Sequence, residues 1–331
     1  MSQRRGLAGW QIATLSTVGA VGSLALANWL TRVGQREPER ALAGTEALYP
    51  WTEGTISYTA HGRGEPLLLL HDLRPGASGY EYRNVFGALS ERYRVFAPDL
   101  LGYGLSGRPA THYTAQLYVA LIEDFLRQVV GATDQPAHVI ASGHSAPFAV
   151  IAAITQPQLF RSLSLIEPMG IGNAAATRWP IAARVTRALL RAPLIGESAY
   201  NVIVSRPSLR ASLHRKLAEG APPVSDDVVD QYYAVAHLPG GRFASADALA
   251  SALHGLRSAV SEAFTLVSVP TLLLWGQRDP AHPIGEARAL RDLHPGAELR
   301  IFPTGALPHV EAPDAFCREV FAWLRAAARV S

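Results

Sequence analysis

"AHVIASGHSAPFAVIAAITQ", residues 137–156, decides the fold of this chain. Residues 137–143 form a short apolar run, as in a strand covered on both faces, and the residues after Ser145 have the composition of a helix. Gly143 and His144 shape the turn between them. A serine on such a turn has the position of a nucleophile, because the sharp bend lifts its hydroxyl above the sheet. The stretch therefore predicts an α/β protein with Ser145 as the candidate nucleophile.

Short strand-like runs and helical periods alternate on both sides of this stretch. The predicted strands are residues 54–62, 66–72, 93–99, 161–168, 270–276 and 297–303, and the main predicted helices are 80–93, 114–131 and 313–330. Strands that alternate with helices form a mostly parallel sheet with helices on both faces. Their carboxyl ends then share one edge, where ligand sites collect.

About a hundred residues between the strands 161–168 and 270–276 contain no convincing strand. A segment of this length is not a simple loop. Its helical periods cover residues 182–192, 208–220, 225–238 and 246–256. We therefore expect a helical cap over residues 173–256, inserted between the core segments 53–172 and 257–331.

Two further residues complete a candidate catalytic triad. His309 follows the last predicted strand in "GALPHVEAPDAF", and Asp279 follows the preceding strand in "LLLWGQRDP". A serine nucleophile needs a histidine base and a carboxylate that orients it, in the chain order serine, acid, histidine. We predict the triad Ser145, Asp279 and His309, with Glu167 at another strand end as a reserve acid.

An oxyanion hole would be formed by the backbone N–H groups of Leu73 and Ala146. Pro147 stands where a glycine is usual, but it lies in the first helical turn and leaves the N–H of Ala146 in place. His71 is expected to fix the loop. A carboxylate in the oxyanion site would oppose the developing negative charge, so Asp72 is expected either to point away or to leave the activity poor or specialised.

The ordered set "LLLLHD", "PDLLGYGLSGRP", "GHSAP", "LLLWGQRD" and "LPHVEAP" resembles the motifs of the α/β-hydrolase superfamily, over roughly residues 50–328. The resemblance implies an α/β-hydrolase fold with an inserted cap. It also implies the triad roles for Ser145, Asp279 and His309, and the oxyanion roles for Leu73 and Ala146. Relatives with an aspartate nucleophile are disfavoured because position 145 is a serine.

The N-terminal segment is apolar. Residues 6–31 contain no charge and follow Arg4 and Arg5. About 20 apolar residues suffice to cross a bilayer, and flanking arginines favour an N-terminus on the cytoplasmic side. We expect a membrane anchor with the catalytic domain on the outer side, or alternatively a cleaved signal peptide and a secreted domain. Residues 32–52 would be a linker.

Composition excludes several classes of protein. The 331 residues carry a net charge of +3, without a basic stripe, so no nucleic-acid partner is expected. Cys317 is the only cysteine and the histidines lack zinc-site spacing, so the sequence predicts no metal and no cofactor. Oligomeric state is left open.

Three functions are compatible with these residues. The first is hydrolysis of a carboxylic ester, thioester or lactone of a hydrophobic or lipid-like molecule through an acyl-enzyme on Ser145. The second uses the same serine triad to cleave carbon–carbon bonds or to act as a cofactor-free haloperoxidase. The third is a membrane-tethered binding protein that keeps the fold without the chemistry.

Overall fold

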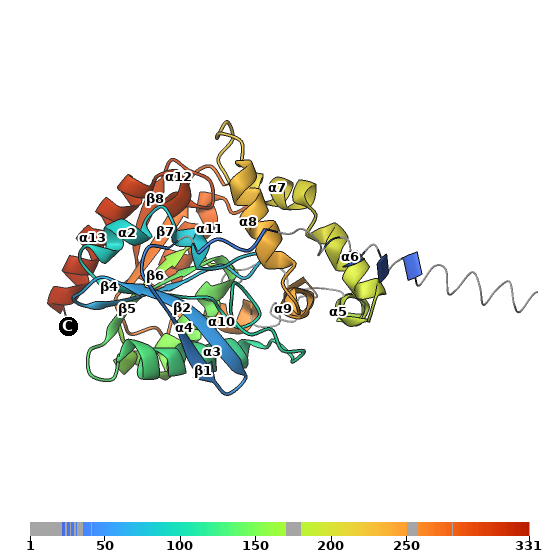
Figure 1. Cartoon of the computed structure of the whole chain (residues 1–331). Coiled ribbons are helices and arrows are strands. Elements are labelled where there is room, and N and C mark those ends of the chain that lie inside the picture. The colour runs from blue at the N-terminus through green and yellow to red at the C-terminus, as the bar shows by residue number, and fades with distance from the viewer. Residues whose placement is uncertain are drawn as a thin grey trace, which may run out of the picture.

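The computed structural model describes residues 36–40, 42–169, 180–249, 257–279 and 281–330, and residues 22, 23, 25, 26, 28, 29 and 31 near the N-terminus. Its centre is one twisted sheet with strand order β1-β2-β4-β3-β5-β6-β7-β8 (Figure 1). The strands are β1 Thr45–Trp51, β2 Gly54–His61, β3 Pro66–Leu70, β4 Arg94–Pro98, β5 Ala137–Ser142, β6 Phe160–Ile166, β7 Thr271–Gly276 and β8 Glu298–Phe302. The pairs β1–β2 and β2–β4 are antiparallel and the others are parallel.

The central strands are wholly buried because their sequences are mostly apolar and contain no charged aspartate, glutamate, lysine or arginine. Every residue of β3, β5 and β7 is buried. Strands with this pattern need a cover on both faces. The predicted strands therefore correspond to β2–β8. The segment 32–52, expected to be a linker, instead contains β1, which adds to the sheet through an antiparallel hairpin with β2.

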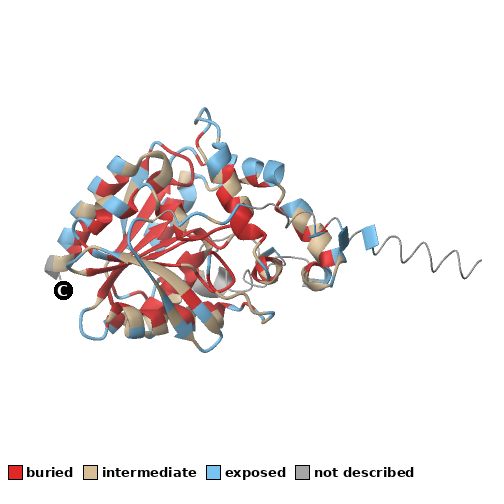
Figure 2. Ribbon diagram, viewed as in Figure 1, coloured by how far each residue is buried: buried red, intermediate tan, exposed pale blue. Residues whose placement is uncertain are grey.

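Helices cover both faces of the sheet, with their buried sides toward it (Figure 2). One core cluster joins one face to helices on that side, and a second cluster joins the other face to the remaining helices. The first layer contains α3 Ala115–Phe125, α4 Ala146–Thr155, α10 Arg257–Phe264 and α11 Ile284–Leu293, and the second contains α2 Phe86–Ser90 and α13 Pro313–Val330. Short helical turns are η1 Gly79–Tyr82, η2 Leu126–Val130, η3 Gly143–Ser145, η4 Pro157–Leu159 and α12 Pro308–Glu311.

Between β6 and α10 the described chain is helical and has a small core of its own. Its helices are α5 Pro180–Arg191, α6 Ile195–Ile203, α7 Arg206–His214, α8 Asp226–Ala236 and α9 Gly241–Leu249. We call them the cap helices. Asp247 of α9 joins them to the main body: it accepts the Tyr113 N–H (2.8 Å) and pairs with Arg187 of α5 (3.0 Å).

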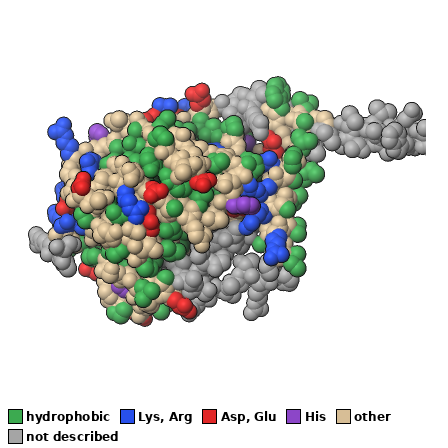
Figure 3. All heavy atoms as spheres, turned by 90° about the horizontal axis from the view of Figure 1, so that it is seen from below, with side chains coloured by type: hydrophobic (Ala, Val, Ile, Leu, Met, Phe, Trp, Pro, Cys, Tyr) green, Lys and Arg blue, Asp and Glu red, His purple; other side chains and the backbone are tan. Residues whose placement is uncertain are grey.

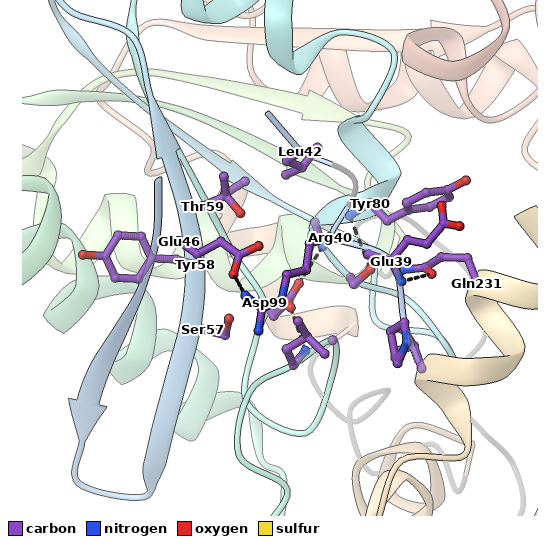
Figure 4. A pocket seen from close by; sticks show the side chains of 17 residues that line it. Glu39, Arg40, Leu42, Glu46, Ser57, Tyr58, Thr59, Tyr80, Asp99 and Gln231 are labelled. Carbon is purple, nitrogen blue, oxygen red and sulfur yellow. Dashed lines mark hydrogen bonds and ion pairs between the residues drawn. The ribbon is translucent and has the colours of Figure 1, made fainter. Parts of the chain in front are cut away.

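The described N-terminal residues run along the cap helices. The backbone N–H of Glu39 donates to Gln231 Oε1 of α8 (2.6 Å), and the Gln231 amide donates back to the Glu39 carbonyl (2.9 Å). A small polar pocket between this segment, β2 and Asp99 has a cavity volume of about 40 Å³ (Figure 4). That volume holds little more than water, so this pocket offers no room for a substrate.

Most of the predicted membrane segment 6–31 lies outside the described residues. In the part of the chain that the structure describes, no helix is both long and apolar enough to cross a membrane.

Candidate functional site

The turn after β5 is built on a glycine. The strand ends at Ser142, and Gly143 has a φ of +56°, in the left-handed region that only glycine enters without cost. Ser145 has a φ of −77° and ordinary right-handed helical geometry. In a nucleophile elbow the strained residue between strand and helix carries the nucleophile. The structure therefore places Gly143, not Ser145, at that position.

Ser145 lies beneath the turn rather than above it. Its side chain is fully buried, and its hydroxyl lies 2.9 Å from the Ser142 carbonyl and 3.1 Å from the Leu70 carbonyl. Among the described residues no hydrogen bond joins Ser145 to His309. The expected geometry of a serine nucleophile is thus absent, and the Ser145 hydroxyl fastens the start of α4 to the ends of β5 and β3.

Asp72 occupies the place expected for an oxyanion. Its Oδ1 accepts two backbone N–H groups, from Leu73 (2.8 Å) and from His144 (2.8 Å). Two amides that converge on one oxygen, one from the loop after β3 and one after the elbow residue, form an oxyanion-hole arrangement. The expectation that Asp72 points away was wrong. The second donor is His144 instead of Ala146, which is buried at the start of α4 with Pro147 behind it.

Gly143 and Asp72 fit together closely. A Cβ atom at position 143 would lie 2.4 Å from Asp72 Oδ1. The carboxylate therefore fills the space into which a nucleophilic side chain at 143 would project. The sequence did not reveal that the Asp72 carboxylate takes the place of a nucleophilic side chain at the elbow, although the unusual Asp72 after His71 pointed to this loop.

His144 is paired with the same carboxylate. Its Nδ1 lies 2.8 Å from Asp72 Oδ1, and since a carboxylate only accepts, Nδ1 carries the proton. The His144 side chain is 29% exposed, whereas the Asp72 side chain is 1% exposed. The pair therefore has the form of an Asp–His dyad whose imidazole is partly exposed.

Cations hold Asp72 ionised. Arg74 Nε lies 3.0 Å from Asp72 Oδ2. Burial raises the pKa of Asp72, but the proximity of His144, Lys216 and Arg74 outweighs burial and lowers the pKa well below its usual range. Burial alone would favour a neutral acid. Asp72 is therefore a carboxylate at neutral pH.

His309 is paired with Glu81 of η1. His309 Nε2 lies 3.2 Å from Glu81 Oε1, both side chains are fully buried, and Tyr82 and Phe316 pack against the imidazole. Burial raises the pKa of Glu81, but His309 and Arg74 outweigh it and lower the pKa to about 2. His309 thus lies against Glu81 rather than making the expected contact with Ser145.

Asp279 is paired with the predicted reserve acid, Glu167. The Glu167 carboxyl accepts the Gly276 N–H (2.8 Å), and Asp279 accepts the Ala281 N–H (2.8 Å). Burial first, and then the neighbouring Asp279, raise the pKa of Glu167 to about 9. Within the described residues no hydrogen bond or ion pair joins Asp279 to His309. The three predicted triad residues therefore lie at one sheet edge without forming a triad.

The loop after β3 is held by His71. Its Nε2 accepts the Leu100 N–H (2.9 Å), so Nδ1 carries the proton and donates to the Asp72 carbonyl (2.7 Å). Arg74 and Glu81, which complete the charge network, were not singled out by sequence reasoning. Neither belongs to a recognisable motif; only the presence of a buried Asp72 implied that a cation must lie nearby.

A cavity of about 640 Å³ lies beyond the ends of β6 and β7. Met169 and Lys216 form part of its wall; the Met169 N–H donates to the Gly143 carbonyl (3.0 Å), and Lys216 Nζ lies 3.5 Å from Met169 Sδ. The cavity is therefore next to the elbow. Its lining also includes Arg215, Leu217, Glu219, Arg278, Ala281 and His282. No group of three His, Cys, Asp or Glu side chains among the described residues is arranged to hold a metal ion.

Comparison with known proteins agrees with this architecture. A model of the alpha/beta hydrolase family matches residues 67–319, and the chain belongs to that family. It is similar to the magnesium-chelatase 30 kDa subunit of Rhodobacter capsulatus, with 29% identity over 303 residues that cover 90% of this chain and 97% of the relative. It is also similar to 2-hydroxy-6-oxo-2,4-heptadienoate hydrolase of Pseudomonas putida, with 25% identity over 75% of this chain and 85% of that enzyme.

Solved structures agree in fold. The crystal structure of a serine hydrolase involved in carbazole degradation superposes with a TM-score of 0.69 and 21% identity, covering 86% of this chain and 99% of that chain. The match supports the mostly parallel sheet, the flanking helices and their order.

Proposed function

We propose that this protein hydrolyses a small carbonyl compound without a serine nucleophile, using His144 as the base that activates water. The observation that carries the proposal is the 2.8 Å contact between His144 Nδ1 and Asp72 Oδ1 beside a glycine at the elbow. With the proton on Nδ1, the basic lone pair of the imidazole lies on Nε2. Asp72 orients the ring and stabilises the imidazolium that forms.

The proposed reaction is hydrolysis of the bond between the carbonyl carbon and the leaving group. His144 Nε2 takes one proton from water while the water oxygen bonds to that carbon and the π electron pair of the C=O bond moves to the carbonyl oxygen. That pair returns to re-form the carbonyl as the leaving group departs. The bond between carbonyl carbon and leaving group then breaks, and His144 returns the proton to the leaving group. The same steps serve a carboxylic ester and an activated carbon–carbon bond; the relative from Pseudomonas putida, named a heptadienoate hydrolase, favours the second.

The cavity supports a substrate with a negative charge and an apolar part. Arg215, Lys216 and Arg278 line it together with Met169 and Leu217. Among the described residues no ion pair joins these three cations to a carboxylate, and the charge of Lys216 already acts on Asp72. We infer that they bind a carboxylate of the substrate.

Replacement of His144 by Gln tests the proposal. With p-nitrophenyl esters and with a dienoate ketone as substrates, the His144→Gln variant should lose at least ~100-fold in kcat, since it lacks the base. Ser145→Ala should stay within about 10-fold of the wild type, because its hydroxyl only holds the turn. His112→Gln, on an exposed histidine, is the matched control.

Two results would reject the mechanism. Covalent labelling of Ser145 by a fluorophosphonate, together with loss of turnover in Ser145→Ala, would show that Ser145 is the nucleophile. Equal turnover in the wild type and in His144→Gln would show that His144 is not the base.

A second candidate function is ligand binding without turnover. The glycine at the elbow and the filled oxyanion amides favour it, and the relative from Rhodobacter capsulatus is named as a subunit of magnesium chelatase. Saturable binding of a hydrophobic carboxylate, measured by calorimetry and weakened in Lys216→Met, with no turnover of any ester or ketone, would select this function.

A further inference from the structure

The cap helix α5 exposes an apolar stripe. Ile181, Val185 and Leu189 are 75%, 60% and 47% exposed. Residues four apart lie one above the other on a helix, so the three side chains share one face. Leu190, on the other side of the helix, is buried in the cap core. Exposed apolar stripes of this kind mark interaction surfaces.

The neighbouring cap helix also exposes apolar side chains. Ile195 and Val202 of α6 are 57% and 72% exposed, and α5 and α6 are in contact. Near the N-terminus, Leu26 and Trp29 are also more than half exposed. We call Leu26, Trp29, Ile181, Val185, Leu189, Ile195 and Val202 the cap face.

The N-terminal residues are fixed to α6. The Asn28 side chain is buried; it donates to the Leu194 carbonyl (3.2 Å) and accepts from Ser198 Oγ (3.0 Å) and Asn201 Nδ2 (3.1 Å). The end of the uncharged run 6–31 therefore lies against α6, as Figure 1 shows.

The charge of α5 suits an anionic surface. Its sequence "PIAARVTRALLR" contains three arginines and no acidic residue. Arg187 and Arg191 pair with the buried Asp247 of α9, and Arg184 is exposed beside the apolar stripe. Hydrophobic and arginine side chains lie together on this side of the molecule in Figure 3. A helix with an apolar face and a basic face is typical of elements that lie in the interface of a lipid bilayer.

We propose that the cap face docks on the surface of a lipid bilayer. The run 6–31 ends at α6, so membrane attachment of that run would bring the cap face to the same surface. This surface is separate from the hydrolytic site, and the proposal does not depend on the reaction.

A fluorophore on the cap face tests the proposal in the full chain. Val185→Cys and, as matched control on the exposed edge strand β1, Leu48→Cys are made in a Cys317→Ala background and labelled with NBD. On addition of vesicles of phosphatidylcholine and phosphatidylglycerol, emission at position 185 should rise at least about twofold and shift to the blue, because the probe leaves water. Emission at position 48 should not change.

A charge on the cap face provides a second test. Val185→Asp should reduce vesicle binding in a flotation assay by at least about tenfold, and Leu48→Asp should leave it unchanged. The proposal is overturned if the full chain floats with vesicles while position 185 stays in water, since the N-terminal run alone then binds. Absence of vesicle binding, or a dimer in solution that buries position 185, would also overturn it.

Discussion

The sheet edge carries two groups of buried carboxylates that differ in their partners. At the ends of β3 and β5, Asp72 and Glu81 lie beside Arg74 and two histidines, and their pKa values are lowered. At the ends of β6 and β7, Glu167 lies beside Asp279, and its pKa is raised to about 9. All four side chains are buried. Burial alone therefore does not determine their protonation; the charge of the neighbour does.

The difference separates two kinds of site within one edge. The first group is fully ionised at neutral pH and fixes His144 through charge. In the second, the raised pKa leaves Glu167 protonated at neutral pH, and the two carboxyl groups accept backbone N–H groups at the end of β7 and in the loop after it.

Removal of the shared cation should have the largest effect. Arg74→Met leaves Asp72 and Glu81 buried with less compensation, so the free energy of unfolding should fall by about 3–5 kcal/mol in urea titration. Arg40→Met, at an exposed pair with Glu46, is the control and should cost at most ~1 kcal/mol. Equal losses in the two variants would contradict the assigned role of Arg74.

A side chain at the elbow should have an intermediate effect. Gly143→Ala forces a Cβ into Asp72 and a left-handed backbone onto alanine, at a cost of about 2 kcal/mol. Gly87→Ala, in a helix with open space around it, should be neutral or slightly stabilising. Asp72→Ala removes the clash, so the penalty at 143 should shrink in the double variant. An unchanged penalty would show that Asp72 does not fill the elbow.

The acid pair should have an effect on stability that changes with pH. Between pH 4.5, the ordinary pKa of glutamate, and pH 9 the folded chain holds a proton on Glu167 that the unfolded chain has released. The stabilisation from that proton is complete below pH 4.5 and is lost as pH rises toward 9, by up to about 1.4 kcal/mol per pH unit. Glu167→Gln should therefore become more stable relative to the wild type from pH 6 to 8, and parallel curves would contradict the pairing.

The strands of the core could be predicted from sequence because their apolar runs are continuous. β1 was missed since "TEALYPW" is only partly buried and contains a proline, which resembles a linker. The helix of residues 80–93 was predicted as one element, but the structure divides it into η1 and α2 around Arg83. Helices α6 and α11 were not predicted.

The site was harder to predict because it depends on which residue stands directly after strand β5. In "SGHS" both Gly143 and Ser145 are small, and either can follow a strand. The extent of β5, which stops at Ser142, puts the glycine at the turn. Local sequence does not determine that stop; pairing of β5 with β3 and β6 does.

Lys216 is the only lysine in the sequence. An amine-selective reagent consequently has two targets, the α-amino group and a side chain on the cavity wall next to Met169. Reductive methylation with a ¹³C label would place an NMR reporter beside the elbow in the unmutated protein. Its resonance would register any anion that enters the cavity, whatever bond the protein breaks.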